Sequence, residues 1–391
     1  MNKLMKSEHE MKKRVICLVH YDLPDNPDMR RCSLPGYTKS NYIFHCLKRL
    51  GYENHILSAS PTTGRQNVNG RTVRLDEQTV LELLPSKGRG SKFRNAMVGF
   101  FFAEKRYRRL KDLVQDGDVL WVYHSTGLIK PLHRLKKARN FRLILEMEEL
   151  YGDIRCSPKT ARREKKLAKL ADAFIFPTAE LNAMLNTEGK PYAISHGTYE
   201  TAPAPLAPRS DDGRIHVVYS GTTNPRKGGI NMAIDAAAYL PENYHVHILG
   251  TGDAETLKAM NQRISDVQAK AVCTVTYDGV LRDRAYTDFL HSCHIGLSTQ
   301  NPEGDYNNSS FPSKILAYLA SGLRVVSVRI PVVVNSRVGN VLYYYEAQTP
   351  EALAATIRSV DVEAAYDSKS LITELDHEFL EALGRILEQE A

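Results

Sequence analysis

The sequence lacks any apolar run long enough to cross a membrane, a span that takes about 20 residues. Its N-terminal stretch, MNKLMKSEHEMKKR, carries charges without an apolar segment behind them, so no signal peptide is predicted. The six cysteines are scattered, with no C-x-x-C pair and no nearby histidine at zinc-ligand spacing. We therefore expect reduced, structural thiols and a cytoplasmic location.

The charge is unevenly distributed between the two halves of the chain. Residues 1–200 hold 36 Lys+Arg and 22 Asp+Glu, a net charge of +14. Because the whole chain has a net charge of +7, residues 201–391 carry a net charge of −7. The basic half indicates a polyanionic partner, either an anionic membrane surface or nucleic acid, and a solvated basic face is the plainer alternative. A charged content of 25% and a hydrophobic content of 42% exclude the disordered and fibrous classes.

Short β-branched apolar runs alternate with helix-compatible segments in both halves of the chain. The first half contains RVICLVHY, NHILSAS, DVLWVYHS, FRLILEME and DAFIFPT, and the second contains IHVVYSG, HVHILGTG, CTVTYDG, IGLSTQ and LRVVSV. Such alternation predicts parallel sheets with helices on both faces. We therefore predict an α/β protein of two doubly wound, Rossmann-like domains that face a central cleft.

A proline-rich stretch, ETAPAPLAPRSDDGR, separates the two series of predicted strands. We expect an N-terminal domain over residues 1–200, a linker over 201–213, a C-terminal domain over 214–370 and a C-terminal helix over 371–391. In open α/β sheets ligands bind at the carboxyl ends of the strands. The loops that follow the predicted strands are therefore the candidate sites.

One such loop lies in VVYSGTTNPRKGG. Gly221 opens a turn after a predicted strand, and Lys227 stands where the next helix begins, with Arg226 beside it. Backbone N–H groups and an ammonium at one point suit an anionic phosphate, although the loop is not a Walker A motif. The alternative is a turn that ends in a solvated lysine.

A second candidate is the stretch NNSSFPSKILAYLASGLRVVS. It predicts a helix capped by Ser310 or Phe311, with Pro312 in the first turn and Gly322 at the end. The helix start and Lys314 would form a second anion site. The apolar side of the same helix is expected to pack in the core.

Together these two stretches resemble the donor-binding lobe of GT-B glycosyltransferases, especially glycosyltransferase family 4. The resemblance covers nearly the whole chain through ILGTGDAETLK, VTYDGVL, LGYENHILS, HSTG, LILEMEELYG, ADAFIFPTAEL and ISHGTY. It implies a nucleotide-diphosphate sugar donor on the C-terminal lobe and an acceptor on the N-terminal lobe. It also implies a retaining transferase for a lipid-linked or polysaccharide acceptor, active in polysaccharide or cell-envelope biosynthesis.

The resemblance assigns roles to individual residues. The donor would contact Gly221, Thr222, Arg226, Lys227, Gly250, Gly252, Gly279, Asn308, Ser309, Ser310, Phe311 and Lys314. The acceptor side would include Gly36 and Tyr37, and the catalytic groups would be His124, Glu146 and Glu148. No cofactor is implied, and because the chain has no tight D-x-D cluster we expect no metal in the reaction.

The sequence departs from the family pattern in three places. Thr222 stands where an arginine is common, and Ser309 and Ala317 stand where a pair of glutamates is frequent. Loss of the second glutamate removes ribose hydrogen bonds that we estimate at roughly 1 to 3 kcal/mol of donor affinity. Two alternatives therefore stay open, a nucleotide-sugar epimerase and a catalytically silent partner of another transferase.

The segment from Ser91 to Val114 combines apolar and basic residues at helical spacing. The apolar residues include Phe100, Phe101, Leu110 and Val114, and the basic residues include Arg108 and Arg109. This pattern is typical of a helix on an anionic membrane surface, which would make the protein peripheral at the inner face of the membrane. A core helix with a solvated basic side is the alternative. Nucleic acid is not favoured because no reader module is recognisable.

Overall fold

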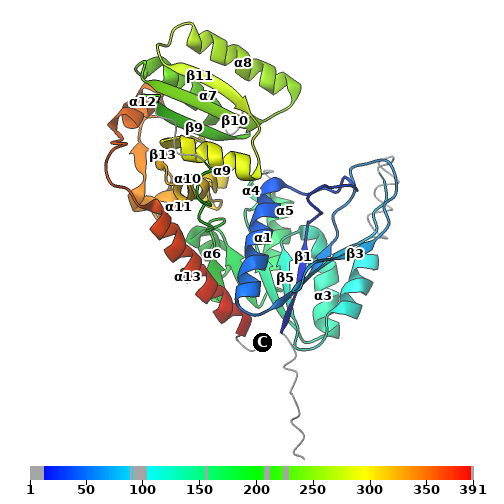
Figure 1. Cartoon of the computed structure of the whole chain (residues 1–391). Coiled ribbons are helices and arrows are strands. Elements are labelled where there is room, and N and C mark those ends of the chain that lie inside the picture. The colour runs from blue at the N-terminus through cyan, green and yellow to red at the C-terminus, as the bar shows by residue number, and fades with distance from the viewer. Residues whose placement is uncertain are drawn as a thin grey trace, which may run out of the picture. The chain divides into compact units, whose positions relative to one another are not determined.

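The computed structural model describes residues 13–88, 90, 104–154, 157–206, 212–222 and 229–388. The chain divides into two compact units, coloured mainly from blue to green and from green to red in Figure 1, although the last residues of the chain, in red, belong to the first unit. The N-terminal unit comprises Met1–Phe176, Leu185–Ala193 and Leu380–Ala391, and the C-terminal unit comprises Pro177–Met184 and Ile194–Phe379. Within the described ranges, no helix has both the length and the apolar character that a membrane span requires.

The N-terminal unit is built on an eight-stranded sheet with the strand order β3-β4-β2-β1-β5-β6-β7-β8. Strand β3 runs antiparallel to β4, whereas the pairs β4–β2, β2–β1, β1–β5, β5–β6 and β6–β7 are parallel. The strands are β1 (Arg14–Val19), β2 (Glu53–Ser58), β3 (Arg71–Asp76), β4 (Thr79–Leu83), β5 (Val119–Tyr123), β6 (Arg142–Glu146), β7 (Ala173–Phe176) and β8 (Tyr192–Ile194).

Local sequence signals explain where the helices of this part of the chain begin. In α1 (Leu34–Arg49) the Ser33 hydroxyl accepts the Gly36 N–H at 3.3 Å, and Pro35 lies in the first turn, where its missing N–H is not needed. The Ser157 hydroxyl caps α5 (Pro158–Ala168) in the same way. The other helices are η1 (Thr126–Leu128), α3 (Ile129–Ala138), α4 (Tyr151–Ile154), α6 (Ala179–Leu185) and an unlabelled helix over 104–113.

The C-terminal unit has a six-stranded sheet with the order β11-β10-β9-β12-β13-β14, in which every neighbouring pair is parallel. The strands are β9 (Ile215–Thr222), β10 (Tyr244–Thr251), β11 (Thr274–Gly279), β12 (Ile295–Ser298), β13 (Arg324–Val328) and β14 (Tyr343–Tyr345). The helices are α7 (Gly229–Ala236), η3 (Ala237–Tyr239), α8 (Ala254–Gln268), α9 (Asp283–Ser292), η4 (Asp305–Asn308), α10 (Lys314–Ala320), α11 (Pro331–Val334), η5 (Gly339–Val341), α12 (Pro350–Ser359) and α13 (Ser368–Glu388).

Each sheet has one point at which the strand order reverses. In the N-terminal unit the chain builds outward from β1 to β3 and then returns to place β5 on the other side of β1. In the C-terminal unit it builds from β9 to β11 and then places β12 on the other side of β9. The predicted pair of Rossmann-like sheets is confirmed. Because ligands bind at such reversal points, the loops after β1, β5, β9 and β12 are of most interest.

Helix α10 starts later than the sequence predicts. It begins at Lys314, and the N–H groups of Ile315 and Leu316 donate to the carbonyls of Pro312 and Ser313 in a tighter preceding turn. The predicted end is confirmed. Gly322 has a φ of +82°, and the Leu323 N–H donates to the Tyr318 carbonyl at 3.0 Å, as in a glycine C-cap.

The packing of α10 on β12 leaves no room for a side chain at Gly296. A Cβ added there would lie 2.4 Å from the ring of Tyr318, which is fully buried. We expect Gly296→Ala to lower the free energy of unfolding by about 1 to 3 kcal/mol, because the ring or the strand has to move. Urea unfolding measures this effect. The control is Gly384→Ala in α13, where the nearest atom to a new Cβ is 3.5 Å away and no loss is expected. Equal stability of the two variants would contradict this account.

Candidate functional site

An acidic cluster with one lysine lies at the carboxyl end of β6. Glu146 ends the strand and is fully buried. Lys39 of α1 places its Nζ 2.7 Å from a carboxylate oxygen of Glu148 and 4.0 Å from one of Glu146. Burial, and then the negative charge of Glu148, raise the pKa of Glu146 well above its usual range, although Lys39 acts in the opposite direction. The cluster therefore combines a carboxyl that resists ionisation with an ion pair.

His124 follows β5 and lies beside this cluster. Its backbone N–H donates to the Glu146 carbonyl at 2.9 Å, and its ring stacks on Tyr151 with the centroids 4.4 Å apart. Its Nε2 lies 3.6 Å from a carboxylate oxygen of Glu164, which also accepts the N–H groups of Tyr151 and Gly152. Burial alone raises the pKa of Glu164, but the contacts with His124 and the two N–H groups outweigh it and lower the pKa. His124 therefore faces a buried anion.

Gly36 and Tyr37, the predicted acceptor-side pair, lie in the first turn of α1. A Cβ at Gly36 would come within 2.8 Å of the Ser33 hydroxyl, so glycine permits the cap of this helix. The Tyr37 ring stacks on Tyr21 with the centroids 4.8 Å apart. The Tyr21 hydroxyl donates to Asn41 at 2.7 Å, which holds the pair against α1. The structure does not test their contact with an acceptor.

A small hollow opens at the reversal point between β1 and β5. The half-buried Arg106 reaches into it from the helix over 104–113, and its buried Nε has no hydrogen-bond partner among the residues that the structure describes. A cationic group with a buried, unused donor suits an anionic ligand. The hollow is lined by Leu18, Val19, His20, Ala59, Arg106, Tyr123, Ser125 and Leu128.

The described part of the predicted membrane segment packs inward. Leu110 and Val114 are fully buried, and the guanidinium of Arg109 donates to both carboxylate oxygens of Glu82, at 2.6 and 2.7 Å. Arg108 is exposed and contacts Glu104 at 3.4 Å. These contacts match the core-helix alternative for this stretch. Phe100 and Phe101 lie outside the described residues, so the membrane surface stays a prediction.

In the C-terminal unit the two predicted anion-binding stretches meet at the carboxyl end of β9. The Nζ of Lys314 lies 4.0 Å from the centroid of the Tyr219 ring. A Cβ at Gly221 would lie 3.0 Å from that same Nζ, so a side chain at this position would crowd the ammonium at the strand end. Of Thr222, only the backbone at the end of β9 is described. Arg226 and Lys227 lie outside the described residues.

Hydrogen bonds to Ser220 hold two helices at this strand end. Its N–H donates to the Tyr318 hydroxyl of α10 at 2.8 Å, and its Oγ lies 2.8 Å from the Tyr286 hydroxyl of α9. Burial raises the pKa of Tyr318 well above its usual range, so this hydroxyl keeps its proton. The network holds α10, and with it Lys314, against the end of β9.

The loop before α10 uses several of its own polar groups internally. The N–H groups of Ser309 and Ser310 both donate to the Tyr306 carbonyl, at 3.4 and 2.9 Å. Ser309 is only 1% exposed, whereas Asn308 is exposed. In this conformation the N–H groups predicted for the donor are therefore partly occupied within the loop, and Asn308 presents the accessible side chain.

Phe311 serves as an anchor for the same loop. It is buried and stacks on His196 with the ring centroids 4.5 Å apart and the planes at 26°. The Nδ1 of His196 in turn lies 2.6 Å from the carbonyl oxygen of Pro177. The Thr178 hydroxyl donates to the Ser309 carbonyl at 3.1 Å. We therefore see Phe311 as a positioning residue for the loop.

The remaining predicted donor residues also lie at the carboxyl edge of this sheet. The carbonyl of Gly250 in β10 accepts the Tyr277 hydroxyl at 2.9 Å. Gly252 precedes Asp253, which caps α8 by accepting the Thr256 N–H at 2.8 Å. Gly279 ends β11 with a φ of +79°, a conformation that favours glycine. Their contact with a donor is not tested.

The sequence reasoning did not identify four side chains that shape these clusters: Lys39, Arg106, Glu164 and Tyr219. Lys39 carried a weak signal, because it lies three residues after Gly36 on the same helix face. Glu164 is the one acidic residue within the basic run ARREKKLAK. This isolated acid was the local signal for a buried side chain with a polar partner. Arg106 was one of many arginines in its segment, so nothing singled it out.

Comparison with protein families matches residues 214–360 to the family described as "Glycosyl transferases group 1". This match lies within the C-terminal unit and includes the strand end with Gly221 and Lys314. No curated protein matches the chain significantly in sequence.

Many solved structures share the fold at low sequence identity. An E. coli structure described as trehalose-6-phosphate bound with UDP-2-fluoro glucose has a TM-score of 0.68 at 12% identity, over 96% of this chain and 99% of that one. A UDP-forming trehalose-phosphate synthase from Burkholderia xenovorans, in complex with glucose-6-phosphate, has a TM-score of 0.62 at 11% identity, over 95% and 98%. Sucrose-phosphate synthase from Thermosynechococcus elongatus has a TM-score of 0.66 at 14% identity, over 95% and 97%.

Proposed function

We propose that the chain is a GT-B glycosyltransferase, in which the group 1 glycosyltransferase match over residues 214–360 marks the donor-binding part, and that its acceptor is a sugar that carries a phosphate group. The donor in this proposal is a nucleotide-diphosphate sugar bound by the C-terminal unit. Transfer proceeds with retention of the anomeric configuration. The acceptor is either a free sugar phosphate or a sugar joined to a lipid through phosphate, and both present the same anionic chemistry.

The observation that carries the donor part of the proposal is the position of Lys314. Its ammonium lies against Gly221 at the reversal point of the sheet. Helix α7 begins at Gly229, next to Tyr219, and has no acidic residue in its first turn that would repel an anion. A cation, a glycine and a helix start at one strand end suit the diphosphate of the donor.

This arrangement supports departure of a nucleotide diphosphate. In the proposed step the bond between the anomeric carbon and the diphosphate oxygen breaks, and its electron pair stays with the leaving group. The Lys314 ammonium stabilises the developing charge. The acceptor hydroxyl oxygen forms the new bond on the same face of the sugar, and its proton passes to the leaving oxygen.

The acceptor part of the proposal rests on the hollow around Arg106. Its guanidinium is the cationic group of the hollow, and its Nε has no hydrogen-bond partner in the described part of the chain. A guanidinium fork matches the geometry of a phosphate, with which it forms two parallel hydrogen bonds. The fold relative from Burkholderia xenovorans was solved with glucose-6-phosphate, which agrees with this choice of acceptor. An uncharged polysaccharide would leave the guanidinium unused.

The cluster at β6 is proposed to position the reacting hydroxyl. The Glu148 carboxylate, paired with Lys39, is 23% exposed, whereas Glu146 and His124 are buried. Glu148 is therefore the group able to accept a hydrogen bond from an acceptor. His124 and Glu146 act through it as positioning residues.

The proposal is tested by measuring release of nucleoside diphosphate from UDP-, GDP- and ADP-sugars, with product mass spectrometry. One arm adds hexose 6-phosphates, and the other adds lipid-diphosphate sugars in vesicles. Release that requires a phosphate-bearing acceptor supports the proposal. Conversion of a donor alone to its epimer would support the epimerase alternative instead. No turnover with any donor would favour the silent-partner alternative.

Arg106→Gln is expected to raise the KM for the phosphate-bearing acceptor by about 10- to 100-fold, with little change in the KM for the donor. The reason is that a hydrogen bond to a charged group contributes about 1.5 to 3 kcal/mol. The matched control is Arg108→Gln on the same helix, where the side chain is exposed. Steady-state kinetics with both substrates varied measures the effect. Equal acceptor KM values for the two variants would exclude the hollow as the phosphate site.

A further inference from the structure

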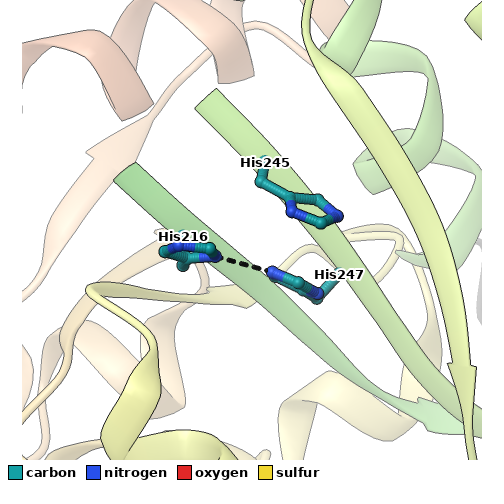
Figure 2. A group of neighbouring side chains, drawn as sticks. All are labelled: His216, His245 and His247. Carbon is teal, nitrogen blue, oxygen red and sulfur yellow. Dashed lines mark hydrogen bonds between the residues drawn. The ribbon is translucent and has the colours of Figure 1, made fainter. Parts of the chain in front are cut away.

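Three histidines gather at the amino ends of β9 and β10, at the edge of the sheet opposite the donor residues. His216 of β9 is in register with His245 of β10, and His247 is two residues further along the same strand. Because side chains alternate between the two faces of a strand, all three project from one face. Figure 2 shows the three rings close together, with His216 and His247 joined by the dashed line and His245 beside them. Each ring offers one nitrogen, and these three nitrogens all lie within 4.8 Å of one another.

We propose that His216, His245 and His247 bind a divalent transition-metal ion of the zinc class. This site is separate from the proposed glycosyl-transfer reaction. Gly221 lies five positions after His216 in β9, which corresponds to roughly 16 Å along the strand. The metal therefore has no contact with the donor and serves to hold β9 and β10 together at their amino ends.

Carboxylates fix the ring protons of two of the histidines. The Nε2 of His216 lies 3.0 Å from an oxygen of Asp212, and the Nδ1 of His247 lies 3.1 Å from an oxygen of Asp278. An ionised carboxylate only accepts hydrogen bonds, so each of these ring nitrogens carries a proton. Histidines that bind metals have this same outer partner, a carboxylate that orients the ring.

The inner nitrogens of these two rings face each other. The Nδ1 of His216 and the Nε2 of His247 are 2.8 Å apart, as the dashed line in Figure 2 indicates. With the protons on the outer nitrogens, two neutral rings would present lone pairs to each other at this distance. Either a shared proton or a cation resolves the conflict, and a metal ion accepts both lone pairs at once.

His245 supplies a third lone pair. The Thr276 hydroxyl donates to Asp278 at 3.0 Å, so its oxygen is free to accept the Nε2–H of His245 at 3.0 Å. This assignment leaves the Nδ1 of His245 without a proton. That buried nitrogen has no hydrogen-bond partner within the described residues. A third acceptor beside the other two favours a metal ion over a shared proton, because a proton satisfies only two nitrogens.

The donor set indicates which metals fit. Neutral imidazoles suit zinc, copper, nickel and cobalt ions rather than magnesium or calcium. Zinc–nitrogen bonds of about 2.0 to 2.1 Å place tetrahedral ligands about 3.3 Å apart. This value lies between the 2.8 Å of the closest pair and the 4.8 Å limit of the group. The rings of His245 and His247 pack on each other with the centroids 3.8 Å apart, so they turn when the three nitrogens bind one ion. Three histidines leave the fourth position for water.

The test uses the full chain without a histidine tag. Titration calorimetry with Zn²⁺ is expected to give one site, and Co²⁺ is expected to give visible absorption bands of the intensity seen for four- or five-coordinate cobalt. His216→Phe and His245→Phe keep an aromatic ring but remove the ligand, and each should weaken Zn²⁺ binding by at least about tenfold. Asp278→Asn should also weaken binding by about tenfold or more, because it removes the outer carboxylate.

The matched control is His291→Phe, which replaces a histidine of α9 whose Nε2 lies 3.0 Å from the Pro203 carbonyl rather than in the cluster. Its metal affinity should equal that of the unchanged protein. Absence of a saturable single Zn²⁺ site in the unchanged protein would overturn the proposal, as would binding that survives both phenylalanine substitutions. If a variant fails to fold, the Zn²⁺ stoichiometry and Co²⁺ spectrum of the unchanged protein decide the question.

Discussion

Lys314→Ala is expected to weaken binding of the nucleotide-diphosphate sugar by roughly 10- to 100-fold. The substitution removes the ammonium that lies against Gly221, and a hydrogen bond between charged groups contributes about 1.5 to 3 kcal/mol. The same charge is proposed to stabilise the leaving diphosphate, so kcat should fall as well. Titration calorimetry gives the affinity, and acceptor-dependent release of nucleoside diphosphate gives the rate.

The control for this prediction is Lys258→Ala, which removes an exposed lysine from α8 of the same unit. It should leave donor affinity unchanged. Thermal unfolding without ligand should be compared for the two variants, because Lys314 also contacts the Tyr219 ring. Donor affinities that are equal in the two variants would show that Lys314 does not contact the donor.

Glu146→Gln is expected to make the protein more stable than the unchanged chain, by a margin that grows with pH. The pKa of Glu146 is raised by burial and then by Glu148. Between the unfolded value, about 4.3, and this raised value, the folded state binds more protons than the unfolded state. The unchanged protein therefore loses up to about 1.4 kcal/mol of stability per pH unit over that window. Glutamine does not ionise, so the variant does not lose this stability as the pH rises.

Urea unfolding at pH 5, 6, 7 and 8 measures the difference between the two proteins. The exposed Glu77→Gln provides the control and should show no such trend. Because Glu146 is proposed to position Glu148, the stabilised variant should also turn over more slowly, a trade-off that is common at active sites. A stability difference that does not vary with pH would contradict the burial of an ionisable group at this position.

The fold could be predicted because most of its strands are short apolar runs that can be recognised in the local sequence. The run RVICLV became β1 and HVHILG lies within β10, since buried parallel strands are apolar on both faces. The end of α10 before Gly322 could also be predicted, because a left-handed residue after a helix favours glycine. The start of α10 could not be predicted, because Pro312 fits either a first helical turn or the tighter turn that the structure shows.

The clusters could be predicted only in part, because their members are far apart in the chain. Lys39 and Glu148 form an ion pair across 109 residues, and only the order of the strands brings them together. The approach of Lys314 to Gly221 follows in the same way from β9 and β12 being neighbours. The histidine cluster had one local signal, the pair His245 and His247 on one face of a strand, but His216 joins it only through strand register.

The most direct test of the central claim, a working donor site in the C-terminal unit, is a thermal melt of the protein against UDP, GDP, ADP and their common sugar conjugates. A ligand at one hundred times its Kd adds about 2.7 kcal/mol of stability, which should raise the Tm by a few degrees. We expect a shift with the conjugates of one base, and its loss in Lys314→Ala. A flat response to every nucleotide would contradict the account.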